Sequence, residues 1–494
     1  MKVDYEKFPD IPPGCQLNYN KNTGLYQVFR ESRRIDPETG TKKVVRETIG
    51  SIRDGVYRPG ENYLLRKKNA ELEAEVARLR RLTMKVSKAD RQTDDNAEKV
   101  ETRVAEAIKT SEMDFRRAER THINMAPIAL AALMSALSGD SDAVMIENYL
   151  KIHRDFFEKY LPNSAFDNVS HDTIRRAFML VEPKKFGDFY VQMTFNLIRQ
   201  TERRIVAADG QAVRASARLG KDGALKGTQM LMNFFDTGSR VCLAHEVIDR
   251  KTNEISVGHK MVENLALSGS IVTADAMSCQ VNFVNAVMGA QADYLLSLKG
   301  NQEACWQEVM TLFGSVEESR IQWHRTGYEL AHGRIERREV AILPGALLSK
   351  PMTSKWLGLR EGSVVRLRTV STNKRSGQKT DTYSYYITSI LPTQDNAGRI
   401  YEAIRSHWAI ENNLHYMLDV YWNQDRMQAS NPTYISNRST LNKLALAMLE
   451  HYRFWLWNTG REQDFDAISI KTLQGRCRKP EVTIECLAAG LGFL

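Results

Sequence analysis

Two short apolar runs, each ending in an aspartate, constrain this chain more than any other feature. Residues 204–209 read RIVAAD and residues 270–275 read SIVTAD. Such runs are typical of strands buried on both faces of a sheet. A single aspartate at a strand end is often only a helix cap or a turn residue. A buried carboxylate without a partner is costly, so the repeated pattern indicates a polar site that contains Asp209 and Asp275.

The pattern between and around these runs predicts a mixed sheet covered by helices. Residues 228–235 and 240–248 alternate like strands, and the turn sequence Asp-Thr-Gly-Ser at 236–239 joins them into a hairpin. Helices are expected at 257–267 and 281–288, and a further strand at 293–298. Hairpin strands followed by strand–helix–strand alternation indicate an α/β core whose first part is residues 201–300.

A third acid, Glu411, lies on a predicted helix that begins after residue 396. His407, Glu411 and His415 are spaced four apart, so they share one helical face. The neighbouring face is apolar and would seat the helix on the sheet, through Ile410, Leu414, Met417, Leu418 and Tyr421. The same spacing also permits a His-x3-Glu-x3-His zinc site, although no separate water-activating acid has the spacing that metalloproteases use.

The order of these acids is that of the RNase H-like nucleotidyl transferases: an acid on the first strand, a strand hairpin, an acid after the fourth strand and an acid on a late helix. Three carboxylates can hold two divalent ions, one activating the attacking oxygen and the other steadying the leaving oxygen. Mg²⁺ or Mn²⁺ is the expected cofactor, because Mg²⁺ prefers hard oxygen ligands and keeps some of its waters.

Several segments resemble the DDE insertion-sequence transposases of the H-repeat-associated family. The similar segments are VAADGQAVR at 206–214, TADAMSCQ at 273–280, DYLLSLKGNQ at 293–302, HGRIERR at 332–338 and RSHWAIENNLHYMLDV at 405–420. Upstream, SHDT at 170–173 and its apolar helices are similar to the family's N-terminal associated domain. The resemblance covers roughly residues 120–455. Gln211 departs from it, since the family tends to have Lys there, and Ile404, His407 and Leu418 stand where related transposases have Tyr, Arg and Lys.

The resemblance implies a DNA transposase with Asp209, Asp275 and Glu411 as catalytic and metal-binding residues. Water would attack a phosphodiester at the element end, and the freed 3′-OH would then attack target DNA. The residues expected to support the reaction or to hold DNA phosphates are His407, Lys299, Arg214, Arg334, Arg337, Arg338, Asn412 and His415. Two alternatives stay open: a decayed or domesticated transposase that only binds DNA, and a nuclease without strand transfer.

Residues 1–60 are expected to form a small basic β unit. Residues 25–29 and 43–46 read as strands joined by a turn at 36–40, and six basic residues lie along them: Arg30, Arg33, Arg34, Lys42, Lys43 and Arg46. A basic hairpin of this kind either lies in a DNA groove or is simply a solvated surface.

Residues 61–120 are expected to form a coiled coil and a helical connector. Leu65, Leu72, Leu79 and Val86 recur every seven residues, with Asn on the other seam, which favours a parallel homodimer through residues 61–88. An amphipathic helix that packs within one chain is the alternative. Residues 89–120 are polar and are expected to be solvent-exposed.

Four further divisions complete the organisation. Residues 121–200 are expected to form an all-helical domain, for DNA binding or for packing alone, and residues 301–395 a β-rich insertion. Residues 396–460 are expected to be the part of the core that carries Glu411. Residues 461–494 are expected to form a tail with a basic spot at 476–480. The third acid is therefore in place only if the insertion folds aside and lets its helix return to the sheet.

Composition favours an anionic partner. The 494 residues carry a formal net charge of +9, and such an excess is most often matched by nucleic acid, here double-stranded DNA at the terminal inverted repeats and the target. The 6 scattered cysteines suit a reducing compartment. With neither a secretory signal nor an apolar run of ~20 residues, a cytoplasmic, nucleoid-associated protein without membrane contact is expected.

Overall fold

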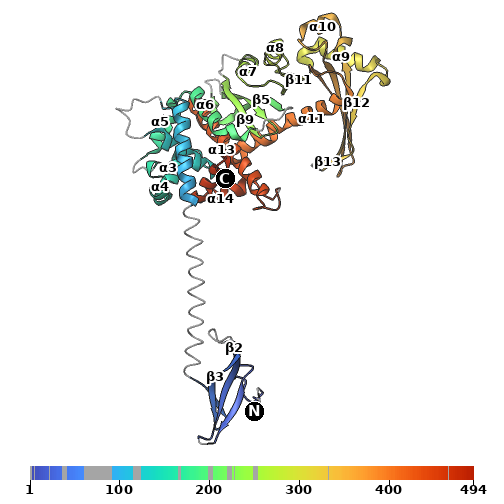
Figure 1. The fold of residues 1–494 in the computed structure, drawn as a ribbon. Helices are drawn as coiled ribbons and strands as arrows, with labels where there is room; N and C mark the ends of the chain where they lie inside the picture. Colours follow the sequence, from blue (N-terminus) through green and yellow to red (C-terminus); the bar gives the residue numbers. More distant parts are fainter. Residues whose placement is uncertain are drawn as a thin grey trace. The chain divides into compact units, whose positions relative to one another are not determined.

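The computed structural model describes residues 3–4, 6–21, 23–35, 42–60, 92–114, 124–164, 169–198, 204–219, 225–226, 228–248, 254–331, 333–465 and 467–494. They belong to two compact units, Met1–Gln92 and Thr93–Leu494. Figure 1 draws the described strands of the first in dark blue and the second from light blue to red. Among the described helices, none is long and apolar enough to cross a membrane.

The first unit contains a four-stranded antiparallel sheet. Its strands, in their order across the sheet, are β1 (Gln16–Asn20), β2 (Leu25–Ile35), β3 (Lys42–Arg53) and β4 (Val56–Pro59). A small apolar core around Val28, Ile49 and Ile52 stabilises it. The predicted hairpin is thus present as β2 and β3, whereas its turn and the predicted coiled coil at 61–88 lie outside the described residues.

Two of the six predicted basic side chains of this hairpin are described, and both have partners within the unit. Arg46 forms an ion pair of 2.5 Å with Glu31 and lies over the ring of Phe29. Arg30 donates a hydrogen bond to the Pro13 carbonyl. The side chains at 33, 34, 42 and 43 lie outside the described part, so DNA binding by this hairpin stays a prediction.

The second unit is built on one ten-stranded mixed sheet. The order across it is β12-β14-β15-β16-β11-β10-β5-β8-β9, with β13 beside β14. β10 runs parallel to β5 and to β11, and the other pairings are antiparallel. The strands are β5 (Ile205–Val213), β8 (Gln229–Asp236), β9 (Val241–Ile248), β10 (Ile271–Ala274), β11 (Asp293–Leu298), β12 (Gln322–Arg325), β13 (Glu329–Ala331), β14 (Arg334–Pro344), β15 (Ser363–Asn373) and β16 (Lys379–Thr388); β6 (Arg218–Leu219) and β7 (Leu225–Lys226) form a separate small pair.

The β-rich segment that follows the core continues the same sheet. β16 pairs antiparallel with β11, with Leu296 opposite Ile387, so β12 to β16 extend the sheet beyond β11. The segment therefore lies within the sheet, and the helix at residues 394–410 still returns to pack on β5 and β10. Without β16, β11 would leave a row of backbone groups unpaired at an edge, and the apolar faces of the two strands match.

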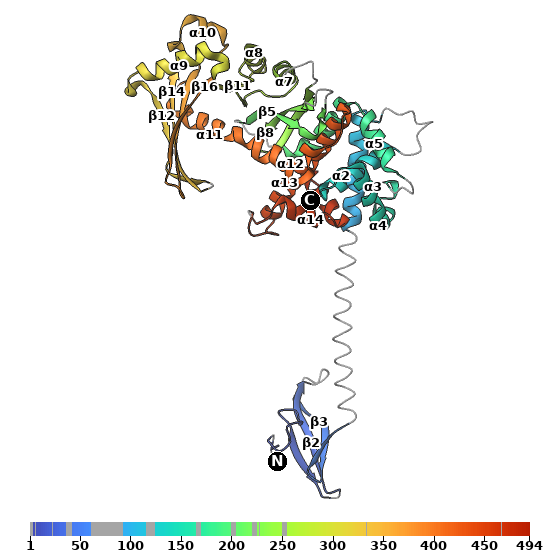
Figure 2. The same ribbon diagram turned by 180° about the vertical axis from the view of Figure 1, so that it is seen from behind.

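Side chains on the two faces of this sheet enter different cores. On β5, Val206 and Ala208 pack with α7 (Glu254–Glu263), α8 (Val281–Gly289) and α9 (Glu303–Ser315). Ile205 and Ala207 face the opposite way, where α11 (Gln394–Ile410) and α13 (Pro432–Asn458) contribute buried residues. Figures 1 and 2 show α7 and α8 on one side of the strands and α11 and α13 on the other. The short helix α10 (Lys350–Lys355) precedes β15.

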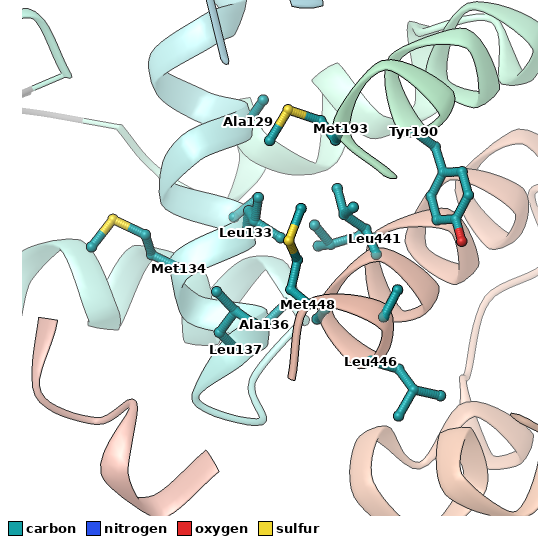
Figure 3. Packing of buried hydrophobic residues seen from close by; sticks show 14 of the residues in the cluster. Ala129, Leu133, Met134, Ala136, Leu137, Tyr190, Met193, Leu441, Leu446 and Met448 are labelled. Carbon is teal, nitrogen blue, oxygen red and sulfur yellow. The ribbon is translucent and has the colours of Figure 1, made fainter. Parts of the chain in front are cut away.

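A helical layer packs around α13, which is buried over most of its length. In Figure 3, Leu133 of α2, Met193 of α6 and Met448 of α13 converge in its core. The layer contains a helix over residues 93–110 and the helices α2 (Met125–Leu137), α3 (Ala143–Ile152), α4 (Arg154–Tyr160), α5 (His171–Leu180), α6 (Pro183–Thr194), α14 (Ile470–Arg476) and α15 (Pro480–Gly490).

Two expectations about this layer are wrong. The helix at 93–110 is not solvent-exposed, because Val100, Val104 and Ile108 recur every four residues and enter the core as one stripe. The C-terminal residues are not a free tail either, since α14 and α15 pack on α13. In the basic spot, Arg476 forms an ion pair of 2.6 Å with Glu462.

Candidate active site

Asp209 and Asp275 occupy equivalent places on neighbouring parallel strands. Ala208 of β5 is the register partner of Ala274 of β10, and each aspartate is the next residue along. Adjacent strands are ~4.8 Å apart, and side chains alternate between faces, so both carboxylates lie on the face that α11 covers. Asp275 follows β10 directly, and its Oδ1 accepts a hydrogen bond from the Ser278 amide at 3.2 Å. Asp209 does not end its strand as expected, because β5 continues to Val213 by pairing with β8.

Glu411 begins a π-helical turn, Glu411–His415, between α11 and α12 (Tyr416–Trp422). The backbone stays helical across both junctions. Ile410, Leu414 and Leu418 are buried, so the predicted apolar face seats this helix. At its end, the Trp422 indole donates to the Ala136 carbonyl at 2.9 Å. Single π-helical turns inside α-helices occur frequently at functional sites.

His415 joins the first and third acids. Its Nδ1 lies 3.3 Å from Glu411 Oε2 and 3.7 Å from Asp209 Oδ2. One ligand atom from each of Asp209, Glu411 and His415 lies within 4.8 Å of the other two. Across the described parts of the chain, these are the residues whose His, Cys, Asp or Glu atoms converge closely enough to hold a metal ion.

The electrostatics of the site show an excess of negative charge. Burial is the main cause that raises the pKa of Asp209; His415 opposes this, and the carboxylates of Asp275 and Glu411 raise it further. The pKa of Glu411 is lowered, chiefly by its hydrogen bond with His415. A divalent cation would neutralise such a cluster, and carboxylate oxygens are the ligands that Mg²⁺ and Mn²⁺ prefer. The donor set therefore fits these ions.

His407 does not converge with Glu411 and His415. Its Nδ1 lies 3.0 Å from the Thr273 hydroxyl, over β10. Burial lowers the pKa of His407, while the charge of Asp275 opposes this shift. The zinc arrangement that the spacing of 407, 411 and 415 permits is therefore not formed.

Gln211 links β5 by hydrogen bonds to the residues that follow Glu411. It is buried, its Nε2 donates to Asp419 Oδ1 at 3.0 Å, and its Oε1 accepts from Gln424 at 2.7 Å. Burial, with a contribution from Asp425, raises the pKa of Asp419 to about 6. Gln211, which stands where the family tends to have Lys, therefore contributes to packing. Its side chain is used in this network and does not reach a DNA phosphate.

Three of the predicted supporting residues are exposed near the end of the sheet where Asp209 and Asp275 lie. Arg214 follows β5, and its charge lowers the pKa of Glu411 and of Asp419. Asn412 is exposed beside Glu411, and Lys299 is exposed directly after β11.

The structure does not bring the three predicted arginines of β14 to the acids. β14 lies four strand positions from β10, roughly 19 Å at the usual spacing. Arg338 is buried, and its guanidinium pairs with Glu329 at 2.8 Å and also with Glu336. Arg337 lies 3.0 Å from Glu339, whereas Arg334 is exposed. A DNA-backbone contact is therefore not supported for Arg338, whose donors are used inside the sheet extension.

One residue of the site was not identified from the sequence. Asn233 of β8 is completely buried, is the register partner of Asp209 and lies 3.1 Å from His415 Nε2 through its Nδ2. The available signal was an amide in the middle of an apolar strand, since buried polar groups need partners.

Comparisons with known proteins identify the family to which this chain is similar. Residues 200–448 match the family model described as the transposase DDE domain. The chain is 29% identical over 318 residues to "Putative protein YbfL" of Escherichia coli (strain K12), which covers 63% of this chain and 81% of that protein. It is 28% identical over 318 residues, with the same coverage, to "H repeat-associated putative transposase YhhI" of the same organism.

Among solved structures, the piggyBac transposase synaptic complex with hairpin DNA aligns over 78% of each chain, with 10% identity and a TM-score of 0.37. That score is too low to support a statement about this fold. The family match spans about half of the chain and contains all three acids and the intervening strands. This chain therefore belongs to the family of transposases that carry a DDE domain.

Proposed function

We propose that this chain is a DNA transposase that moves an insertion sequence by metal-dependent phosphodiester hydrolysis and transfer of the freed 3′-OH to target DNA. Asp209, Asp275 and Glu411 would hold two divalent ions, Mg²⁺ or Mn²⁺. The observation that carries the proposal is that Asp209, which lies beside Asp275 on parallel strands, converges with Glu411, and that the charges of both other acids raise the pKa of Asp209.

The topology supports an RNase H-like core. β5, β8 and β9 form the first strand and its hairpin, β10 returns parallel to β5, and the second acid follows β10. The third acid lies on a later helix that packs on β5 and β10. This layout is that of the RNase H-like nucleotidyl transferases, and the names of the relatives point in the same direction.

The groups around the acids suit a DNA substrate. When bound, divalent ions would polarise the scissile phosphate and lower the pKa of the attacking water. The chain's own contribution is to hold the carboxylates rigidly, through β5, β10 and the anchored helix. The exposed cations Arg214 and Lys299 would contact phosphates at this edge, which positions DNA without reading its sequence.

The test compares Asp275→Asn with a control, Asp188→Asn, at an exposed acid of α6. The substrate is DNA that carries the inverted repeats flanking the coding sequence, incubated with Mg²⁺ or Mn²⁺. Asp275→Asn should lose cleavage by about 10³-fold, because a lost ligand removes several kcal/mol of transition-state stabilisation, yet should still retard the repeats in a gel.

Three results would count against the proposal. Undiminished metal-dependent cleavage by Asp275→Asn would remove that residue from the site. Cleavage without joined products would indicate a nuclease, and repeat binding without cleavage by the unaltered chain would indicate a protein that only binds DNA.

A further inference from the structure

A buried pair, Asn233 and His415, lies directly behind the carboxylates. Asn233 is 0% exposed and His415 is 4% exposed. The Asn233 Nδ2 donates to the Leu231 carbonyl at 3.2 Å and lies 3.1 Å from His415 Nε2. On the other side of the ring, Nδ1 faces Glu411 Oε2 and Asp209 Oδ2.

These contacts determine where the imidazole carries its proton. A backbone carbonyl only accepts, so the nitrogen of the Asn233 amide, and not its oxygen, must face Leu231. The second hydrogen of that nitrogen then points at His415 Nε2, which must accept it. A proton on Nε2 would place two donors opposite each other inside the core, so the hydrogen-bond geometry places the ring N–H on Nδ1.

We propose that Asn233 is a positioning residue that holds the ring N–H of His415 on Nδ1, where it donates to Glu411 and Asp209, so that His415 orients the carboxylates and is not itself a metal ligand. The metal-related part rests on the proposed function, whereas the position of the proton does not.

The arrangement has two consequences for ion binding. The imidazole N–H engages Oε2 of Glu411, which leaves the other carboxylate oxygen of Glu411 for an ion. An N–H on Nδ1 also leaves that nitrogen without a lone pair to offer to an ion. An Nδ1 lone pair would instead make His415 a nitrogen ligand within the same cluster, and that arrangement favours softer ions than Mg²⁺.

The position of the proton is tested on the metal-free full chain labelled with ¹⁵N in its 10 histidines. The spectrum of His415→Asn identifies the His415 signals by their loss. We expect the shift pattern of a ring whose N–H is on Nδ1, and a mixture of forms in Asn233→Leu, which lacks the amide donor. A ring protonated on Nε2, or on both nitrogens, would overturn the proposal.

The role of His415 is tested by electron spin echo of the Mn²⁺-loaded full chain and by Mn²⁺ affinity. The amide nitrogen of His415→Asn can replace the Nδ1 donor but is a poor ligand. His415→Asn should therefore keep an affinity close to that of the unaltered chain, whereas His415→Ala should lose about 10–100-fold, as when a group that orients a ligand is removed. Asp188→Asn serves as the unaffected control.

The outcomes separate the two proposals. An imidazole nitrogen coupling to Mn²⁺ that disappears in His415→Asn, with equal affinity losses in the Asn and Ala variants, would make His415 a ligand and overturn the inference. Mn²⁺ affinity that does not change in Asp209→Asn would instead contradict the proposed function and the metal-related part of the inference. The result on the proton position would stand in that case.

Discussion

Lys443 lies in the middle of α13 with no hydrogen-bond partner for its Nζ among the described residues. Its side chain is 2% exposed, and burial lowers its pKa from 10.5 to about 8. A buried ammonium is costly because it loses its hydration without gaining a counter-charge. We predict that Lys443→Met, which keeps a similar length without a charge, stabilises the chain at neutral pH.

The size and sign of the effect follow from the pKa. A change from 10.5 to about 8 corresponds to about 3 kcal/mol, at 1.36 kcal/mol per pH unit. Between pH 8 and 10.5 the unfolded chain binds more protons at this lysine than the folded chain, so the stability of the natural chain rises with pH. Below pH 8 the full cost of the buried charge is present. The gain from Lys443→Met should therefore be about 3 kcal/mol at pH 7 and about half as large at pH 9.5.

The assay is urea unfolding of the full chain at these two pH values, followed by the fluorescence of its 7 tryptophans. Lys260→Met, at an exposed lysine of α7, is the matched control and should change stability by less than about 0.5 kcal/mol. An equal gain at both pH values would show that packing, and not charge, is responsible. A loss of stability at pH 7 would refute the reasoning outright.

Further predictions concern ion pairs and assembly. Arg240→Met should lower stability in urea unfolding, because Arg240 lies 3.0 Å from Glu450, whose side chain is 2% exposed. The loss should be smaller than the roughly 3–5 kcal/mol of an unpaired buried charge, since Arg453 stays 3.9 Å from the same carboxylate, and the additional Glu450→Met change should recover part of it. Arg338→Gln should lower stability and leave DNA affinity in a gel-shift titration unchanged, whereas Arg334→Gln should weaken DNA binding, and the reverse pattern would contradict the assignment of Arg338 to the sheet extension. A chain without residues 1–92 should sediment as a smaller oligomer than the full chain, and an unchanged oligomeric state would count against the heptad dimer.

Much of the core was predictable from local patterns. The strands before Asp209 and Asp275 and the helix around Glu411 arise from apolar runs and helical spacing, which act over a few residues. The apolar stripe of Ile410, Leu414 and Leu418 is buried as predicted. The same local patterns do not predict how far a strand continues. β5 extends past Asp209 because it pairs with β8 there.

The sequence by itself therefore determined the candidate acids and the elements that carry them. The tertiary structure decided where the β-rich segment joins the sheet, that the C-terminal helices pack on α13, and how the acids are held. Asn233 and His415 are 182 residues apart, and Gln211 and Asp419 are 208 apart. Whether a buried amide meets an imidazole or a DNA phosphate depends on which chain segments pack together, and no spacing within either segment contains that information.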